Sequence, residues 1–307
     1  MSALRRELAD YLSVRRALGF KLDRDGKLLP DFLAYLARIG TTHVTSATAV
    51  TWASQPRAVH PAWWTARLVM VRGFAKYLHT LDPRHEVPPL GLLPHRRART
   101  EPYVYSEADI AALLSATATV RSAMKATTYR TLLALLSVTG LRVGEAIALD
   151  ERDVDRSHAV LLIRKTKFGK TREVPLHATT VKALVSYARE RDRAVLRRRT
   201  RSFFVSSSGT RLFYQNVQQT FLQLVYAAGL WAGRPRRPRI HDLRHTFAIR
   251  TVLGWYRAGQ DVEARLPLLS TYLGHVGCSS TYWYLSAVPE LLQQATIRLE
   301  RACKARR

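Results

Sequence analysis

Apolar side chains recur at helical intervals through the first 97 residues of the chain. Leucine and aromatic positions spaced three or four apart are typical of helices with one buried face. Thr45 followed by Ser46 is a suitable N-cap for a short helix through Trp52. The pattern predicts a small bundle of about four helices, at residues 4–18, 29–36, 45–52 and 61–81.

The helical pattern stops after residue 81, where prolines become frequent. Prolines at positions 83, 88, 89 and 94 fragment the next stretch, and residues 95–99 are mostly basic. Proline and charge together are typical of a boundary or linker. We therefore expect a helical domain at residues 1–97, a linker at residues 98–105 and a second domain at residues 106–307.

Helical patterns resume in the second domain. Ser106 is a suitable cap for a helix that runs to about residue 114. A further helical pattern covers residues 122–139, Gly140 is a typical helix stop, and a new helix begins near Val143.

Strand-like runs follow at residues 158–164 and 171–176, on either side of a basic segment. This arrangement predicts a β-hairpin with a basic tip, and residues 203–205 are expected to add a third strand. The remainder has a helical pattern. The expected fold class is mainly α with a small antiparallel β-sheet, made of a helical N-terminal bundle and an α+β domain.

The charge of the chain points to a polyanionic partner. The 307 residues carry a formal net charge of +26, with 15 basic and 7 acidic residues before position 98 and 34 and 16 after it. Charge of one sign on both domains fits binding to double-stranded DNA, because each neutralised phosphate releases counterions. A membrane binder would concentrate its charge in one helix or tail, and no uncharged apolar run reaches the ~18 residues of a membrane span.

The cysteine content and the N-terminal sequence predict the cellular location of the protein. Two cysteines, Cys278 and Cys303, do not make a disulfide framework. The amphipathic N-terminus does not have the pattern of a signal peptide. We expect a cytoplasmic protein associated with the nucleoid and with no membrane partner.

Candidate chemistry gathers around one tyrosine near the C-terminus. Arg142 closes a Thr-Gly-Leu-Arg segment, His241 and Arg244 are spaced H-x-x-R, His275 ends a Leu-Gly-His segment, and Tyr284 lies nine residues later. Arginine binds two phosphate oxygens at once and histidine can transfer protons. Such groups around a tyrosine suit phosphoryl transfer to its hydroxyl.

Over residues 103–300 this order resembles the tyrosine recombinase (phage integrase) family. The family's first arginine lies in T-G-L-R-x-x-E, which is matched here by residues 139–145. Its β-hairpin lysine lies upstream of a Val-Pro-Leu strand, and counting back from Val174 selects Lys167.

The resemblance implies a role for each matched residue. Arg142 and Arg244 would clamp the scissile phosphate, while Tyr284 attacks it to give a 3′-phosphotyrosine and a free 5′-hydroxyl. Lys167 would protonate that hydroxyl, and His241 would act as the general base. His275 would bond a phosphate oxygen. Neither ATP, metal nor another cofactor is implied.

Several neighbouring residues leave alternatives open. Glu145 is expected to have a structural role and to orient Arg142. Tyr282 and Tyr272 compete with Tyr284 as the nucleophile. His241 and His245 have a spacing that could bind zinc.

Basic residues outside this set are candidate phosphate contacts. Some interleave with apolar positions of the first domain, others lie in the hairpin, and others in a proline-arginine arm before His241. They are Arg67, Arg72, Lys76, Lys165, Lys170, Arg172, Arg236, Arg237 and Arg239. The segment between Arg244 and His275 is expected to hold an enlarged loop or a longer helix.

The functional prediction is site-specific DNA recombination, with a mobile element as the expected setting. The resemblance implies a homotetramer on two DNA sites, alone or with related recombinases. The C-terminal helix from residue 288 would dock into a neighbouring protomer, or else pack on its own domain. One alternative is DNA relaxation of the type IB topoisomerase kind, and another is a non-catalytic architectural DNA-binding subunit.

Overall fold

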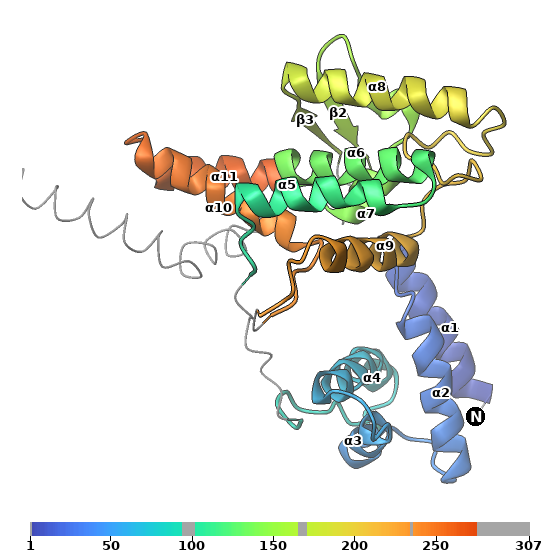
Figure 1. Cartoon of the computed structure of the whole chain (residues 1–307). Helices are drawn as coiled ribbons and strands as arrows, with labels where there is room; N and C mark the ends of the chain where they lie inside the picture. Colours follow the sequence, from blue (N-terminus) through green and yellow to red (C-terminus); the bar gives the residue numbers. More distant parts are fainter. Residues whose placement is uncertain (1, 94–101, 165–170, 234–235, 275–307) are drawn as a thin grey trace, which may run out of the picture. The chain divides into compact units, whose positions relative to one another are not determined.

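The computed structural model describes residues 2–93, 102–164, 171–233 and 236–274 (Figure 1). The chain divides into two compact units, Met1–Thr100 and Glu101–Arg307. Within the described residues no helix is long and apolar enough to cross a membrane.

The described part of the first unit contains four helices: α1 (Ser2–Ala17), α2 (Asp25–Arg38), α3 (Ser46–Ser54) and α4 (Pro61–Leu81). Thr45 caps α3 through a reciprocal pair of bonds with Thr48. Apolar faces of all four helices meet in one core, in which Phe32, Trp52 and Phe74 are buried. The predicted helical pattern of this region is confirmed.

Arg67, one of the predicted DNA contacts, is buried in this unit. Its side chain is only 9% exposed, its Nη2 donates to the Trp52 carbonyl at 2.8 Å, and its guanidinium lies 3.7 Å from the centre of a Trp52 ring. Burial lowers the pKa of Arg67. Arg67 belongs to the bundle core, which argues against its predicted contact with DNA phosphate.

The second unit is built from helices and a small sheet. The longer helices are α5 (Glu107–Ser115), α6 (Ala123–Thr139), α8 (Ala178–Ala194), α9 (Tyr214–Ala227), α10 (Asp242–Arg257) and α11 (Val262–Leu273). The shorter ones are α7 (Val143–Ala148) and the 3-10 turns η1 (Ala116–Thr119) and η2 (Glu151–Asp153). The predicted cap at Ser106 is confirmed by its paired bonds with Asp109.

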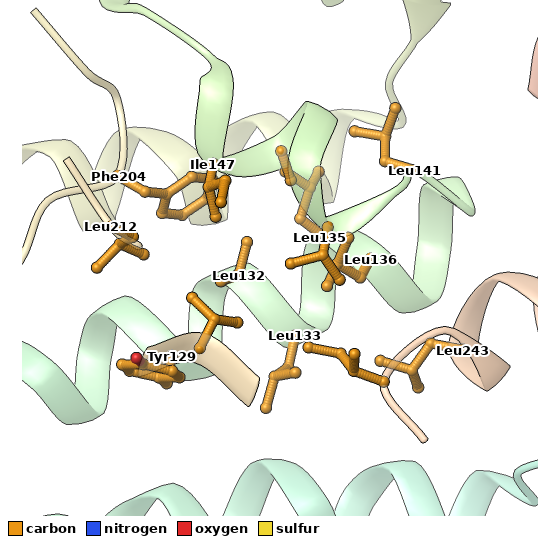
Figure 2. Packing of buried hydrophobic residues seen from close by; sticks show 14 of the residues in the cluster. Tyr129, Leu132, Leu133, Leu135, Leu136, Leu141, Ile147, Phe204, Leu212 and Leu243 are labelled. Carbon is orange, nitrogen blue, oxygen red and sulfur yellow. The ribbon is translucent and has the colours of Figure 1, made fainter. Parts of the chain in front are cut away.

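Helix α6 lies at the centre of this unit and packs against both α8 and α10. Figure 2 shows its leucines, among them Leu132 and Leu136, converging with Phe204, Leu212 and Leu243 from other segments. Each fully buried leucine stabilises the fold by roughly 1.5–3 kcal/mol. Their burial holds α6 in place, and elements that follow α6, among them α8 and α10, pack against it.

The sheet has three antiparallel strands in the order β1 (Val154–Asp155), β2 (Val160–Ile163) and β3 (Arg172–Pro175). Strands β2 and β3 pair with Val160 opposite Pro175 and Ile163 opposite Arg172. The predicted strands of the hairpin are therefore confirmed, while its basic tip at residues 165–170 lies outside the described residues.

The predicted third strand at residues 203–205 is wrong. These side chains are fully buried, and their backbone groups bond outside the sheet: Phe203 N donates to Leu149 O, and Val205 N to the Tyr187 hydroxyl. Val205 makes only an isolated bridge with Arg211. A short apolar run matches the pattern of a buried strand, but the pattern does not show which hydrogen-bond partners its backbone will have.

Candidate active site

The turn between α6 and α7 delivers Arg142 to the site. Helix α6 ends at Gly140 in the left-handed conformation, with φ at +61°. A Cβ added to Gly140 would lie 2.5 Å from Phe247 Cδ1, so a side chain here would require the Phe247 ring to move. Arg142, two residues after Gly140, is the N-cap of α7.

Arg142 is held through its guanidinium group and through its backbone N. Its Nη1 donates to Glu145 Oε1 at 2.8 Å, and its Nη2 donates to Gly274 O at 3.0 Å. Its backbone N donates to Glu145 Oε2 at 3.0 Å. This is the orienting contact expected of Glu145, and it fixes the plane of the Arg142 guanidinium.

Arg244 reaches the same place from α10. It is only 2% exposed; its Nη1 donates to Gly140 O at 2.8 Å and its Nη2 to Leu273 O at 2.6 Å. The structure therefore brings together Arg142 and Arg244, which are far apart in the sequence.

The meeting point of the two arginines is the C-terminus of α11. The last carbonyls of a helix lack partners inside it and carry partial negative charge, which favours cations. Gly274 ends α11 with φ at +66°. Two arginines beside one helix end make a place where a phosphate could replace or join the carbonyl acceptors.

His241 lies immediately before α10 and on the surface. The pKa of His241 is lowered, first by partial loss of solvent around the ring and then by the positive charge of Arg244. Its ring meets that of His245 edge-on, with centroids 4.8 Å apart. Within the described residues no group of three or more His, Cys, Asp or Glu side chains is placed to hold a metal ion.

Three of the six predicted catalytic residues, Lys167, His275 and Tyr284, lie outside the described residues. So do Tyr282 and the hairpin residues Lys165 and Lys170. Their roles stay predictions.

Tyr272, the more distant candidate nucleophile, is described. It stacks on Phe247 at 5.6 Å between ring centroids. Burial raises the pKa of Tyr272 to about 12, against the smaller effects of Arg172 and Arg244. A higher pKa makes the phenolate harder to form, which argues against Tyr272 as the nucleophile.

The predicted DNA contacts differ in how they are placed. Lys76, Arg236 and Arg237 are exposed, and the Arg237 guanidinium lies 5.7 Å from the centre of a Trp231 ring. Arg72 donates from Nη1 to Pro88 O at 2.7 Å. Lys76, Arg236 and Arg237, which are exposed, and the partly buried Arg72 stay candidates for phosphate contact.

Arg239 and Arg172 are engaged with carboxylates. Arg239 is partly exposed and donates to the buried carboxylate of Asp242 at 2.8 Å. The Arg172 side chain is 11% exposed and paired with Glu145 at 2.8 Å, which argues against its predicted role as a DNA contact. The signal missed in the sequence is strand alternation, because Arg172 shares a face of β3 with the fully buried Val174.

Comparison with known proteins identifies the class. The Phage integrase family model matches residues 104–290. The integrase/recombinase y4rB of Sinorhizobium fredii is 45% identical over 98% of each chain. Tyrosine recombinase XerD of Mycobacterium tuberculosis is 34% identical over 168 residues, covering 54% of this chain and 50% of its own.

Solved structures share the fold. The Tn1549 transposon integrase in complex with transposon right end DNA superimposes with a TM-score of 0.69 at 16% identity, covering 97% of this chain and 98% of its own. The XerH site-specific recombinase bound to a palindromic difH substrate gives a TM-score of 0.64 at 20% identity, over 84% and 73%. The chain belongs to the phage integrase family, and it is a tyrosine-type recombinase.

Proposed function

We propose that this protein cleaves and rejoins DNA at specific sites through a 3′-phosphotyrosine on Tyr284. The observation that carries the proposal is the convergence of Arg142 and Arg244 on the C-terminus of α11. His275 follows that helix end directly, and Tyr284 follows nine residues later. The two arginines would bind the non-bridging oxygens of the scissile phosphate.

The proposed step balances without an energy source. The Tyr284 oxygen attacks phosphorus, the bond to the 5′-oxygen breaks, and the tyrosine proton passes to His241. Lys167 protonates the departing 5′-oxygen, and His275 bonds a phosphate oxygen. A 5′-hydroxyl from another strand reverses the step, and the phosphotyrosine conserves the bond energy for that reversal.

We further propose that the biological setting is a mobile element. A relative over nearly the whole chain is named an integrase/recombinase, and a fold neighbour is a transposon integrase bound to transposon end DNA. The working assembly would be a tetramer on two DNA sites, with the C-terminal helix from residue 288 docked into a neighbouring protomer. The first unit would bind DNA through exposed cations such as Lys76.

A nicked suicide substrate carrying the element's own ends tests this function. Cleavage next to the nick releases a short fragment, so the covalent complex accumulates. We expect a denaturant-resistant protein–DNA adduct in the presence of EDTA and without ATP. Tight binding without an adduct favours the architectural subunit, and relaxation of a plasmid without the site favours the topoisomerase alternative.

The lowered pKa of His241 leads to a titration that can be measured on the free protein. NMR should place the midpoint of His241 below 6.5, its ordinary value. Arg244→Gln should raise that midpoint, because it removes a neighbouring positive charge. The His241 ring binds its proton more tightly in the unfolded chain than in the folded one. Protonation of His241 therefore lowers the free energy of unfolding as the pH falls below 6.5. A midpoint above 6.5 in the wild type would contradict the described surroundings of the ring.

A further inference from the structure

We infer that Arg172 is a positioning residue for Arg142: it holds Glu145 and the C-terminal end of α11 where both orient the Arg142 guanidinium. The inference rests on the proposed function only for its catalytic consequence. The contacts that carry it are all between described residues of the second unit.

Arg172 uses all three nitrogen positions of its guanidinium group. Its Nη1 and Nη2 donate to Glu145 Oε1 and Oε2 at 3.1 and 2.8 Å, and its Nε donates to Tyr272 O at 2.8 Å. One side chain of β3 thereby connects α7 to α11. A paired, two-pronged contact of this kind fixes orientation as well as distance.

The Glu145 carboxylate is shared between two arginines. Oε1 accepts from both Arg142 Nη1 and Arg172 Nη1, and Oε2 accepts from Arg142 N and Arg172 Nη2. The carboxylate is only 10% exposed. Burial raises the pKa of Glu145, but the hydrogen bonds and charge of Arg172, followed by the bonds from Arg142, bring it below its ordinary value.

The end of α11 distributes its last carbonyls among three arginines. Tyr272 O accepts from Arg172, Leu273 O from Arg244, and Gly274 O from Arg142. Displacing the first of these contacts would therefore disturb the helix end on which the other two depend.

Gly274 shows how closely Arg172 fits this helix end. A Cβ at position 274 would lie 2.7 Å from Arg172 Nη1 and 3.0 Å from its Cζ. The backbone there has φ at +66°, which also favours glycine. The glycine before His275 thus leaves the space that the Arg172 guanidinium occupies.

If Arg172 contacts DNA, its removal should reduce DNA affinity; if it positions Arg142, its removal should reduce the rate of cleavage. Removing a phosphate contact weakens binding and reduces its salt dependence. Removing a positioning contact leaves binding intact and slows the chemical step, where a displacement of about 1 Å can cost roughly 100-fold.

The test compares Arg172→Gln and Arg172→Lys with wild type and with Arg211→Gln. Arg211 is a matched control in the same unit, because it also bonds one carbonyl (Ile147 O, 2.9 Å) and one carboxylate (Asp150, 2.5 Å). The DNA dissociation constant and the rate of adduct formation at saturating DNA are measured on the suicide substrate. Thermal unfolding reports stability.

We expect Arg172→Gln to slow adduct formation roughly 10- to 100-fold, while its DNA dissociation constant stays within about twofold of wild type. Arg211→Gln should be close to wild type in both the rate of adduct formation and the dissociation constant. Arg172→Lys should recover part of the rate. Weaker binding with an unchanged rate at saturation would overturn the inference in favour of direct DNA contact. Equal rates for Arg172→Gln and Arg211→Gln would overturn it as well.

A second readout does not depend on cleavage. The Glu145 carboxyl should titrate at higher pH in Arg172→Lys than in wild type, because one nitrogen cannot replace the two-pronged bond. No rise in the Glu145 pKa would overturn the inference even if the variants were slow. A wild type that forms no adduct would count against the proposed function, and the titration would still test Arg172. Should Arg172→Gln fail to fold, Arg172→Lys carries both measurements.

Discussion

Tyr284→Phe should abolish the covalent protein–DNA complex while leaving DNA binding within about twofold of wild type. Phenylalanine keeps the aromatic ring but has no oxygen to attack phosphorus, so the loss should be complete rather than partial. Suicide-substrate trapping followed by denaturing electrophoresis measures the adduct, and fluorescence anisotropy measures binding.

Tyr282→Phe is the matched control for that variant. It removes the same atom two residues away, and it should form the adduct at close to the wild-type rate. An adduct that survives in Tyr284→Phe and disappears in Tyr282→Phe would move the nucleophile to Tyr282.

Arg244→Ala should reduce adduct formation at saturating DNA by roughly 100- to 1000-fold, the loss typical of removing one donor to a developing charge. It also leaves the carbonyls of Gly140 and Leu273 without this partner, which should destabilise the fold by about 1–3 kcal/mol. Single-turnover cleavage and thermal unfolding measure the two effects separately. Arg244→Lys should keep the charge but not the two-pronged geometry, and so recover only part of the rate.

Arg250→Ala is a control on the same helix. Arg250 donates from Nη2 to Tyr105 O at 3.0 Å, so its loss also removes a bond to a carbonyl. We expect it to lower stability without a specific loss of cleavage. Similar cleavage rates for Arg244→Ala and Arg250→Ala would contradict a role for Arg244 at the phosphate.

Much of the fold could be predicted because its signals are local. Gly140 ends α6 in the left-handed conformation that its sequence suggests, and Thr45 and Ser106 cap the helices expected of them. Between Arg244 and position 275, α10 continues to Arg257 and only a short turn separates it from α11, so the extra length forms helix.

Two predicted DNA contacts, Arg67 and Arg172, have partners inside the protein that are distant in the sequence. Charge alone predicts Arg67 as a DNA contact, although it lies four positions before the buried Val71 and thus on the core stripe of α4. Charge alone predicts the same role for Arg172, whose carboxylate partner Glu145 lies 27 positions earlier. Neither pairing has a sequence spacing that could reveal it.

The candidate site was predictable only as a set of residues. The motifs supplied Arg142, Arg244 and His241 through resemblance, since no local rule places residues of α7 and α10 at the end of α11. The structure adds how they are held: consecutive carbonyls at the end of α11, and a carboxylate shared by two arginines.

Covalent catalysis by Tyr284 is tested most directly by identifying the amino acid that carries the DNA. Wild-type protein is trapped on the suicide substrate, digested with protease and nuclease, and analysed by tandem mass spectrometry. We expect a nucleotide joined through its 3′-phosphate to Tyr284. A 5′-phosphate linkage, or attachment to any other residue, would contradict it.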